Sequence, residues 1–288
     1  MIEIIFQNKK DAKRLYQYLQ QKLQTFHFRK NDILLLEDQH IVKVSYNIEL
    51  NDLVKRAFSH FIMEIKQVEW LQIILKEQFF YEDEDEQQQI IDIVQAILDG
   101  NRIDLHSFIE DDDQVHRLEE TIDQMFQENV SFSFDSFVRF RMRPFIDSLG
   151  KYVELAIDEY KMEQEYQMFI QMLREFLNGR KAKISQLHLM MDDEVTFYDA
   201  QFYEIKRAEL VRMVDRKLIS NHPVYIDSVT IAPLLSISPE TIYLYTDDCE
   251  QPLIRTICNI FEERMIIKPL TSFYDMKRKI SMTAEEKM

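Results

Sequence analysis

"FVRFRMRPFIDSLGKYVELAIDEYKMEQEYQMFIQMLREFLNG", residues 137–179, is the longest periodic stretch of the chain. Its apolar side chains recur every three or four residues, which is the spacing of one helix face. This pattern predicts a long central helix from Phe137 to Leu177. Pro144 and Gly150 are expected to kink or split it. Asn178-Gly179 is expected to end it, because glycine readily adopts the left-handed conformation that terminates helices.

The segments before this helix predict a small sheet followed by further helices. "IEIIF" (2–6) has the composition of a strand, and a helix capped by Asn8 follows it as far as about residue 24. Two more apolar runs, 32–38 and 40–46, predict strands, which gives a β-α-β-β order. Long helices are expected over 51–79 and 81–101. The acidic run at 82–86 favours a solvated helix start, and its spacing is poor for the alternative, a cation site.

The residues after Gly179 no longer follow the long helical pattern and predict shorter strands and helices. The pattern predicts a β-hairpin over 184–199, a helix over 202–218, a short helix over 228–237 capped by Asp227, a strand over 241–246, a helix over 251–264 and a strand over 265–270. The last ten residues are expected to fray.

The expected fold is therefore a helix-rich α+β protein, with a small N-terminal β-α-β-β sheet, central long helices and a C-terminal mixed α/β unit. Two regions are predicted: 1–130, an N-terminal α+β and helical region, and 131–288, a central helical spine with a C-terminal α/β domain.

Composition excludes several classes of function. The chain of 288 residues carries 51 acidic and 35 basic side chains, a formal net charge of -16. This charge disfavours binding to nucleic acid or to an anionic membrane surface, since both require cationic patches. Only 3 glycines are present and they lie far apart, so the glycine-rich loops that bind phosphates and dinucleotides are missing. No cofactor is expected.

The sequence also predicts a cytoplasmic protein. Cys249 and Cys258 are too few for a disulfide framework and are expected to be reduced thiols. No segment has the pattern of a signal peptide, and no run approaches the length of a membrane span.

Arg139, Arg141 and Arg143 form the most unusual cluster in this acidic chain. On a continuous helix, Arg139 and Arg143 lie off the apolar face, whereas Arg141 lies on it, midway between Phe137 and Phe145. A guanidinium on a buried face must be paired, or else its stem must lie on the core with its head in water.

Two uses of the arginine cluster therefore stay open. The structural one is an internal ion pair, with Glu165 as the candidate carboxylate and Tyr166 supplying a nearby hydroxyl. The functional one is a contact for an anion or for a carboxylate of a partner protein, made by Arg139, Arg141, Arg143, Glu165 and Tyr166.

No catalytic or metal-binding residue is predicted. The seven histidines include no pair three or four residues apart, so helical metal spacing is missing, and His188 is expected to be a core or sheet-edge residue. The most enzyme-like feature is a set of carboxylates after predicted strands, which could hold a magnesium ion. The plainer interpretation is that Asp192, Asp193 and Glu194 form a polar hairpin turn and that Asp247 and Asp248 begin a helix.

The central and C-terminal segments resemble the YtxC-like family of sporulation proteins from endospore-forming bacteria. The resemblance covers roughly residues 130–268. Its central elements are Phe140, Arg141, Met142, Phe145, the run Ala156-Ile157-Asp158-Glu159, Glu165-Tyr166 and Phe169-Ile170, and its C-terminal elements include His188, Pro239 and Phe261. The resemblance implies a bacterial cytosolic protein with a sporulation association, and it specifies no reaction.

The sequence therefore favours a non-enzymatic sporulation-associated protein that acts by binding an unidentified protein partner. The alternative is a metal-dependent phosphoryl-transfer or hydrolytic enzyme that uses the strand-end carboxylates.

Overall fold

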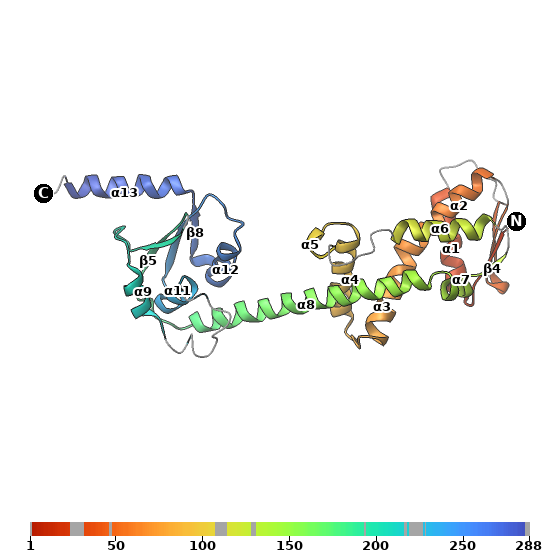
Figure 1. The fold of residues 1–288 in the computed structure, drawn as a ribbon, viewed down its shortest axis with the longest axis horizontal. Coiled ribbons are helices and arrows are strands. Elements are labelled where there is room, and N and C mark those ends of the chain that lie inside the picture. The colour runs from red at the N-terminus through yellow and green to blue at the C-terminus, as the bar shows by residue number, and fades with distance from the viewer. Residues whose placement is uncertain are drawn as a thin grey trace. The chain divides into compact units, whose positions relative to one another are not determined.

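The fold is that of a computed structural model (Figure 1). It describes residues 2–23, 32–45, 48–106, 114–127, 131–192, 194–215, 218, 227 and 229–285. The chain divides into two compact units, Met1–Met162 and Glu163–Met288. Both are mixtures of helices with one small sheet, so the predicted helix-rich α+β class is confirmed.

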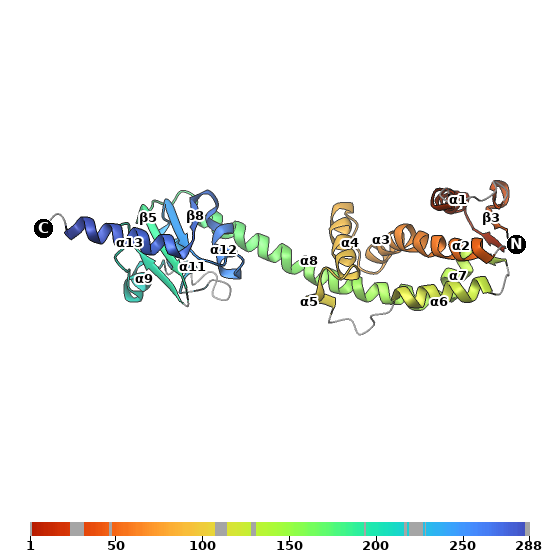
Figure 2. The same cartoon turned by 90° about the horizontal axis from the view of Figure 1, so that it is seen from above.

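The N-terminal unit contains a four-stranded sheet and most of the long helices. Its elements are β1 (Ile2–Ile5), α1 (Lys9–Leu23), β2 (Ile33–Leu36), η1 (Glu37–Gln39), β3 (Ile41–Val44), α2 (Ile48–Phe61), η2 (Ile62–Lys66), α3 (Gln67–Glu77), α4 (Glu84–Leu98), α5 (Ile103–His106), α6 (Gln114–Gln127), β4 (Phe132–Ser133), α7 (Phe134–Phe140) and the first part of α8 (Arg143–Leu177). Helices α2 and α6 contact each other (Figure 2).

The N-terminal sheet has the strand order β2-β3-β1-β4. The predicted β-α-β-β arrangement is confirmed: β1, β2 and β3 pair antiparallel, and the Asn8 side chain accepts a hydrogen bond from the Asp11 amide at 2.8 Å to cap α1. The sequence did not predict β4, which pairs parallel to β1 with Ile4 opposite Phe132. Alternate residues of β1, Ile2 and Ile4, are buried against α1 and α2.

The helical run from α2 to α3 contains one turn of π geometry, η2. A π turn inserts one extra residue, so the helix faces are out of phase before and after it. Lys66 and Gln67 are consequently turned into the protein, with only 7% and 5% of their surfaces exposed. Ile65 and Val68 are displaced toward the opposite side and are only half-buried.

The predicted central helix is interrupted before Pro144. Helix α7 ends at Phe140, and α8 begins at Arg143, so Pro144 lies in the first turn of α8, where its missing N–H leaves no hydrogen bond unmade. Gly150 does not interrupt α8. The break shifts the helical phase, and Met142 takes the buried position that a continuous helix would have given to Arg141.

The boundary between the two compact units lies inside α8, between Met162 and Glu163. Residues 131–162 belong to the N-terminal unit, because Phe134, Phe137 and Phe145 are buried in its core with residues of α2, α3 and α6. The later residues of α8, including Ile170 and Leu173, pack into the core of the C-terminal unit.

The C-terminal unit is a mixed sheet with helices on both faces. Its further elements are β5 (Gln186–Met191), β6 (Val195–Tyr198), α9 (Arg207–Met213), α11 (Ile231–Ile237), β7 (Thr241–Tyr245), α12 (Pro252–Phe261), η3 (Glu262–Arg264), β8 (Met265–Lys268) and α13 (Leu270–Glu285). The strand order is β6-β5-β7-β8, with β5, β7 and β8 parallel and β6 antiparallel to β5.

Alternate residues of β5 and β7 face opposite layers of this unit. Leu187, Leu189, Ile242 and Leu244 pack with the end of α8, α11 and α12. The other face is aromatic and is covered by α13, which contacts β5 and β7. The last ten residues were expected to fray, but α13 continues to Glu285, and residues 286–288 lie outside the described part of the chain.

His188 lies in the middle of the aromatic face with 3% of its surface exposed. Its Nδ1 is 2.9 Å from the Tyr245 hydroxyl, and its ring centroid is 4.2 Å from that of Phe202 and 5.0 Å from that of Tyr243. Burial, reinforced by the positive charge of Lys268, lowers the pKa of His188 from 6.5 to about 4. The histidine is therefore a neutral core residue.

We predict that the C-terminal unit loses stability as the pH falls from 6.5 toward 4. The unfolded chain binds a proton on His188 in this window and the folded chain does not, so protonation favours unfolding. The lowered pKa of His188 corresponds to about 3 kcal/mol. Urea unfolding followed by tyrosine circular dichroism should show this extra pH dependence in the wild type and not in His188→Phe. Parallel pH profiles for the two proteins would contradict the assignment.

Candidate functional site

The three clustered arginines lie at the junction of α7 and α8 and are all exposed. Phe140, between them, is 71% exposed, and the Arg139 guanidinium carbon lies 5.7 Å from the centre of its ring. Arg143 Nε is 3.8 Å from Asp147 Oδ2, but both side chains are largely in solvent. We call Arg139, Phe140, Arg141 and Arg143 the arginine surface.

The expected buried ion pair between Arg141 and Glu165 is wrong. Both side chains are exposed, and neither forms an ion pair with any residue that the structure describes. The physical reason is the break before Pro144, which puts Met142 and not Arg141 on the core face of the helix. The open alternative, a contact for a partner protein, stays a prediction.

Glu165 and Tyr166 belong to the C-terminal unit, whereas the three arginines belong to the N-terminal unit. Tyr166 has an internal role. Its hydroxyl accepts a hydrogen bond from Asn259 Nδ2 at 3.1 Å and is 3.5 Å from Thr256 Oγ1, which joins α8 to α12.

A small pocket of about 190 Å³ lies beside Arg141. Met142, Pro144 and Phe145 form one side of it, and Leu118 and Thr121 of α6 contribute to the other. The arginine surface therefore adjoins a recess large enough for one apolar side chain of a bound protein.

We predict that Arg139→Ala, Arg141→Ala and Arg143→Ala each change the free energy of unfolding by less than about 0.5 kcal/mol, because exposed side chains contribute little to stability. The measurement is urea unfolding followed by the fluorescence of Trp70, the single tryptophan, which lies in the core of the N-terminal unit. A loss above about 2 kcal/mol for Arg141→Ala alone would show that this residue is packed and paired after all.

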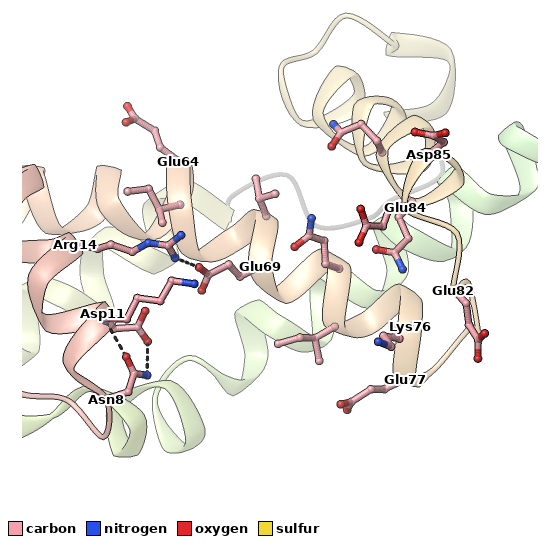
Figure 3. A pocket seen from close by; sticks show the side chains of 17 residues that line it. Asn8, Asp11, Arg14, Glu64, Glu69, Lys76, Glu77, Glu82, Glu84 and Asp85 are labelled. Carbon is pink, nitrogen blue, oxygen red and sulfur yellow. Dashed lines mark hydrogen bonds and ion pairs between the residues drawn. The ribbon is translucent and has the colours of Figure 1, made fainter.

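A larger feature of the N-terminal unit is a groove of about 1270 Å³ along α3 (Figure 3). Its floor is the outer face of η2 and α3, where Ile65, Val68 and Ile73 are displayed. Helix α1 lines one part of it, and the segment from Glu82 into α4 lines another. We call this feature the α3 groove.

A partly buried ion network, centred on the buried Lys66, lies at the α1 end of the α3 groove. Lys66 Nζ donates to Glu69 and lies 3.3 Å from Asp11 Oδ2, and Arg14 donates to the second oxygen of Glu69. Nearby, the Tyr18 hydroxyl donates to Glu64 at 2.7 Å. This hydrogen bond lowers the pKa of Glu64, while burial raises the pKa of Tyr18.

The sequence-based reasoning did not find the α3 groove, although a signal for it was present. Apolar residues in the 51–79 pattern follow one helix face up to Ile65 and Val68, and then recur at Trp70 and Leu71 on a shifted face. Such a slip in register is what one extra residue in a helical turn produces.

We predict that Lys66→Met destabilises the N-terminal unit by about 2 to 3 kcal/mol, because Asp11 and Glu69 would lose the buried cation between them. The matched control is Lys76→Met, an exposed lysine of α3, which should change stability by less than about 0.5 kcal/mol. Trp70 fluorescence during urea unfolding reports both. Equal, small effects of the two changes would mean that the network does not hold α1 against α3.

Two of the strand-end carboxylates of the enzymatic alternative, Asp247 and Asp248, accept hydrogen bonds from backbone amides. Asp247 Oδ1 accepts a hydrogen bond from the Leu270 amide at 3.1 Å, at the start of α13. Asp248 Oδ1 accepts one from the Glu250 amide at 3.0 Å. Asp193 lies outside the described residues. Within the described ranges, no three His, Cys, Asp or Glu side chains are grouped as metal ligands.

Comparison with known proteins places these features in a family. Residues 52–266 match the family described as the YtxC-like family, which is more than half of the chain. The chain belongs to the YtxC-like family. It is also 33% identical over 282 residues to a Bacillus subtilis (strain 168) protein described as "Uncharacterized protein YtxC", with 96% of each chain covered. No solved structure matches it.

These findings confirm the family resemblance that rested on the central and C-terminal motifs. The matched range of the YtxC-like family includes the arginine surface and the floor of the α3 groove, but not the part of the groove formed by α1. No helix in the described part of the chain is both long and apolar enough to cross a membrane.

Proposed function

We propose that this YtxC-like protein is a non-enzymatic, cytosolic, sporulation-associated protein that acts by binding another protein through its arginine surface. The observation that carries this proposal is Phe140, a large apolar side chain that is 71% exposed and is flanked by Arg139, Arg141 and Arg143. Aromatic and arginine side chains are the residue types most enriched at the energetic centres of protein interfaces.

Charge supports the same proposal. Three exposed guanidinium groups within five residues are unusual in a chain of net charge -16, and they offer bidentate donors for carboxylates of a partner. The small pocket beside Arg141 offers a complementary recess for an apolar side chain. The sporulation association is inferred from the family resemblance.

The enzymatic alternative would require Asp247 and Asp248 to bind a metal ion. Their carboxylates already accept hydrogen bonds from backbone amides at 3.1 Å and 3.0 Å. This structural role explains the presence of both carboxylates at the end of the strand without a catalytic role.

We predict that Arg139→Glu/Arg143→Glu lowers the yield of heat-resistant spores while the protein stays as abundant as the wild type, because the change reverses the charge that attracts the partner. A photo-crosslinking amino acid at position 140 should capture a protein during sporulation. The double change should reduce capture about tenfold, as loss of ~1.4 kcal/mol of binding would.

The matched control for this experiment is Lys151→Glu/Lys161→Glu, the same charge change at two exposed positions of α8 in the same unit. It should leave spore yield and capture unchanged. Normal sporulation of a strain without the protein would refute the sporulation association. Equal capture by the two double variants would refute the arginine surface as the binding site.

A further inference from the structure

We infer that the α3 groove is a second binding surface, whose occupant is a cationic amphipathic helix of a partner protein. This surface is separate from the arginine surface and has the opposite charge, so the inference does not depend on the function proposed above.

The apolar floor is the first observation that supports a docking site. The π turn of η2 rotates Lys66 and Gln67 inward and leaves Ile65 and Val68 half-buried along the groove. Ile73, one to two turns further along α3, is 50% exposed. The solvent side of this helix therefore carries three apolar side chains, set among Glu69, Gln72 and Lys76, while its opposite side fills the core.

The walls determine the chemistry of the occupant. Seven carboxylates and three cationic side chains line the groove: Asp11, Glu64, Glu69, Glu77, Glu82, Glu84 and Asp85, against Lys10, Arg14 and Lys76. Among the described residues, Glu77, Glu82, Glu84 and Asp85 take part in no ion pair. An occupant with an apolar face and flanking lysines or arginines would therefore complement both the floor and the walls.

The dimensions fit a helix of about three turns. Ile65 and Glu77 are twelve residues apart, so the floor is roughly 18 Å long at ~1.5 Å per residue. An amphipathic helix lying in an apolar groove is a recurrent mode of peptide recognition, with anchors spaced three, four and seven residues apart. The ion network of Lys66, Asp11, Glu69 and Arg14 fixes one end of the groove.

The experiment uses the full-length chain and two fluorescent peptides of about 18 residues, made only of leucine and lysine. One has the leucines on a single helix face, and the other has the same composition with the leucines spread around the helix. Fluorescence anisotropy at low and at physiological salt gives the dissociation constants. We expect the amphipathic peptide to bind about tenfold more tightly than its isomer.

Two variants test the floor and the wall separately. Ile73→Gln should weaken binding of the amphipathic peptide about three- to tenfold and leave its salt dependence unchanged. Glu77→Lys/Glu82→Lys should weaken binding more than about tenfold at low salt and reduce the salt dependence. Neither glutamate caps a helix: Glu77 is the last residue of α3, and Glu82 precedes α4.

The control for charge is Asp99→Lys/Glu154→Lys, which makes the same change at two exposed residues outside the groove. It should retain wild-type affinity within about twofold, since the distant charges are screened. Trp70 fluorescence checks that every variant is folded.

Several results would overturn the inference. They are absence of peptide binding, equal binding of the two peptides, equal loss in the control and groove variants, or tight binding insensitive to Ile73→Gln. If spermidine displaced the peptide completely, and bound the wild type and Ile73→Gln with equal affinity, the groove would be a site for small polycations. None of these results bears on the arginine surface, which different variants test.

Discussion

The buried ammonium group of Lys66 is the constraint on which the organisation of the N-terminal unit depends. A lysine with 7% of its surface exposed requires compensation, and it receives it from Asp11 of α1 and Glu69 of α3. Its Nζ also lies 5.9 Å from the centre of the Phe134 ring, which connects the same charge to α7. One cation therefore holds three elements from distant parts of the chain.

The π turn is what makes this arrangement sterically available. Without the extra residue, the apolar face of α2 would continue through Ile65 and Val68, and Lys66 would point toward solvent. The same turn leaves those two apolar residues on the outside. The buried network and the α3 groove are therefore two consequences of one change in helical phase, one on each side of the helix.

The sequence predicted which helices and strands form better than it predicted which side of each helix faces the core. The first sheet, the capped α1, the hairpin and the β-α-β unit at the C-terminus all follow from local patterns and are present. The sequence carries a signal for each phase shift, Pro144 for one and the slip in register after Val68 for the other. Which side chain each shift turns into the core, Met142 or Lys66, is decided by tertiary packing and does not follow from local propensity. The arginine prediction failed at this point: a shift of one position moved Arg141 from the core face to solvent.

Helix α13 was missed for a related reason. Its apolar residues Leu270, Phe273 and Met276 form a short stripe, and the charged run Lys277-Arg278-Lys279 follows directly. The helix is stabilised mainly by tertiary contacts. Phe273 is 1% exposed, and its ring contacts those of Tyr198, Phe202 and Tyr245. The helix also depends on Asp247, which receives the Leu270 amide at its first turn.

Asp247 has a structural contact at the carboxyl end of β7, the middle one of three parallel strands. In open α/β sheets, ligands bind beyond the carboxyl ends of the strands, where the strand order reverses direction. The described parallel strands β5, β7 and β8 follow one another in a single direction, so they create no such crevice. At the end of β7, Asp247 accepts a hydrogen bond from the first amide of α13, and Asp248 accepts one from the Glu250 amide in the loop before α12. The C-terminal sheet is thus organised around packing, with the end of α8 on one face and α13 on the other. The two surfaces that we propose for recognition, one cationic and one acidic, both belong to the N-terminal unit, where Phe140 and Ile73 are exposed.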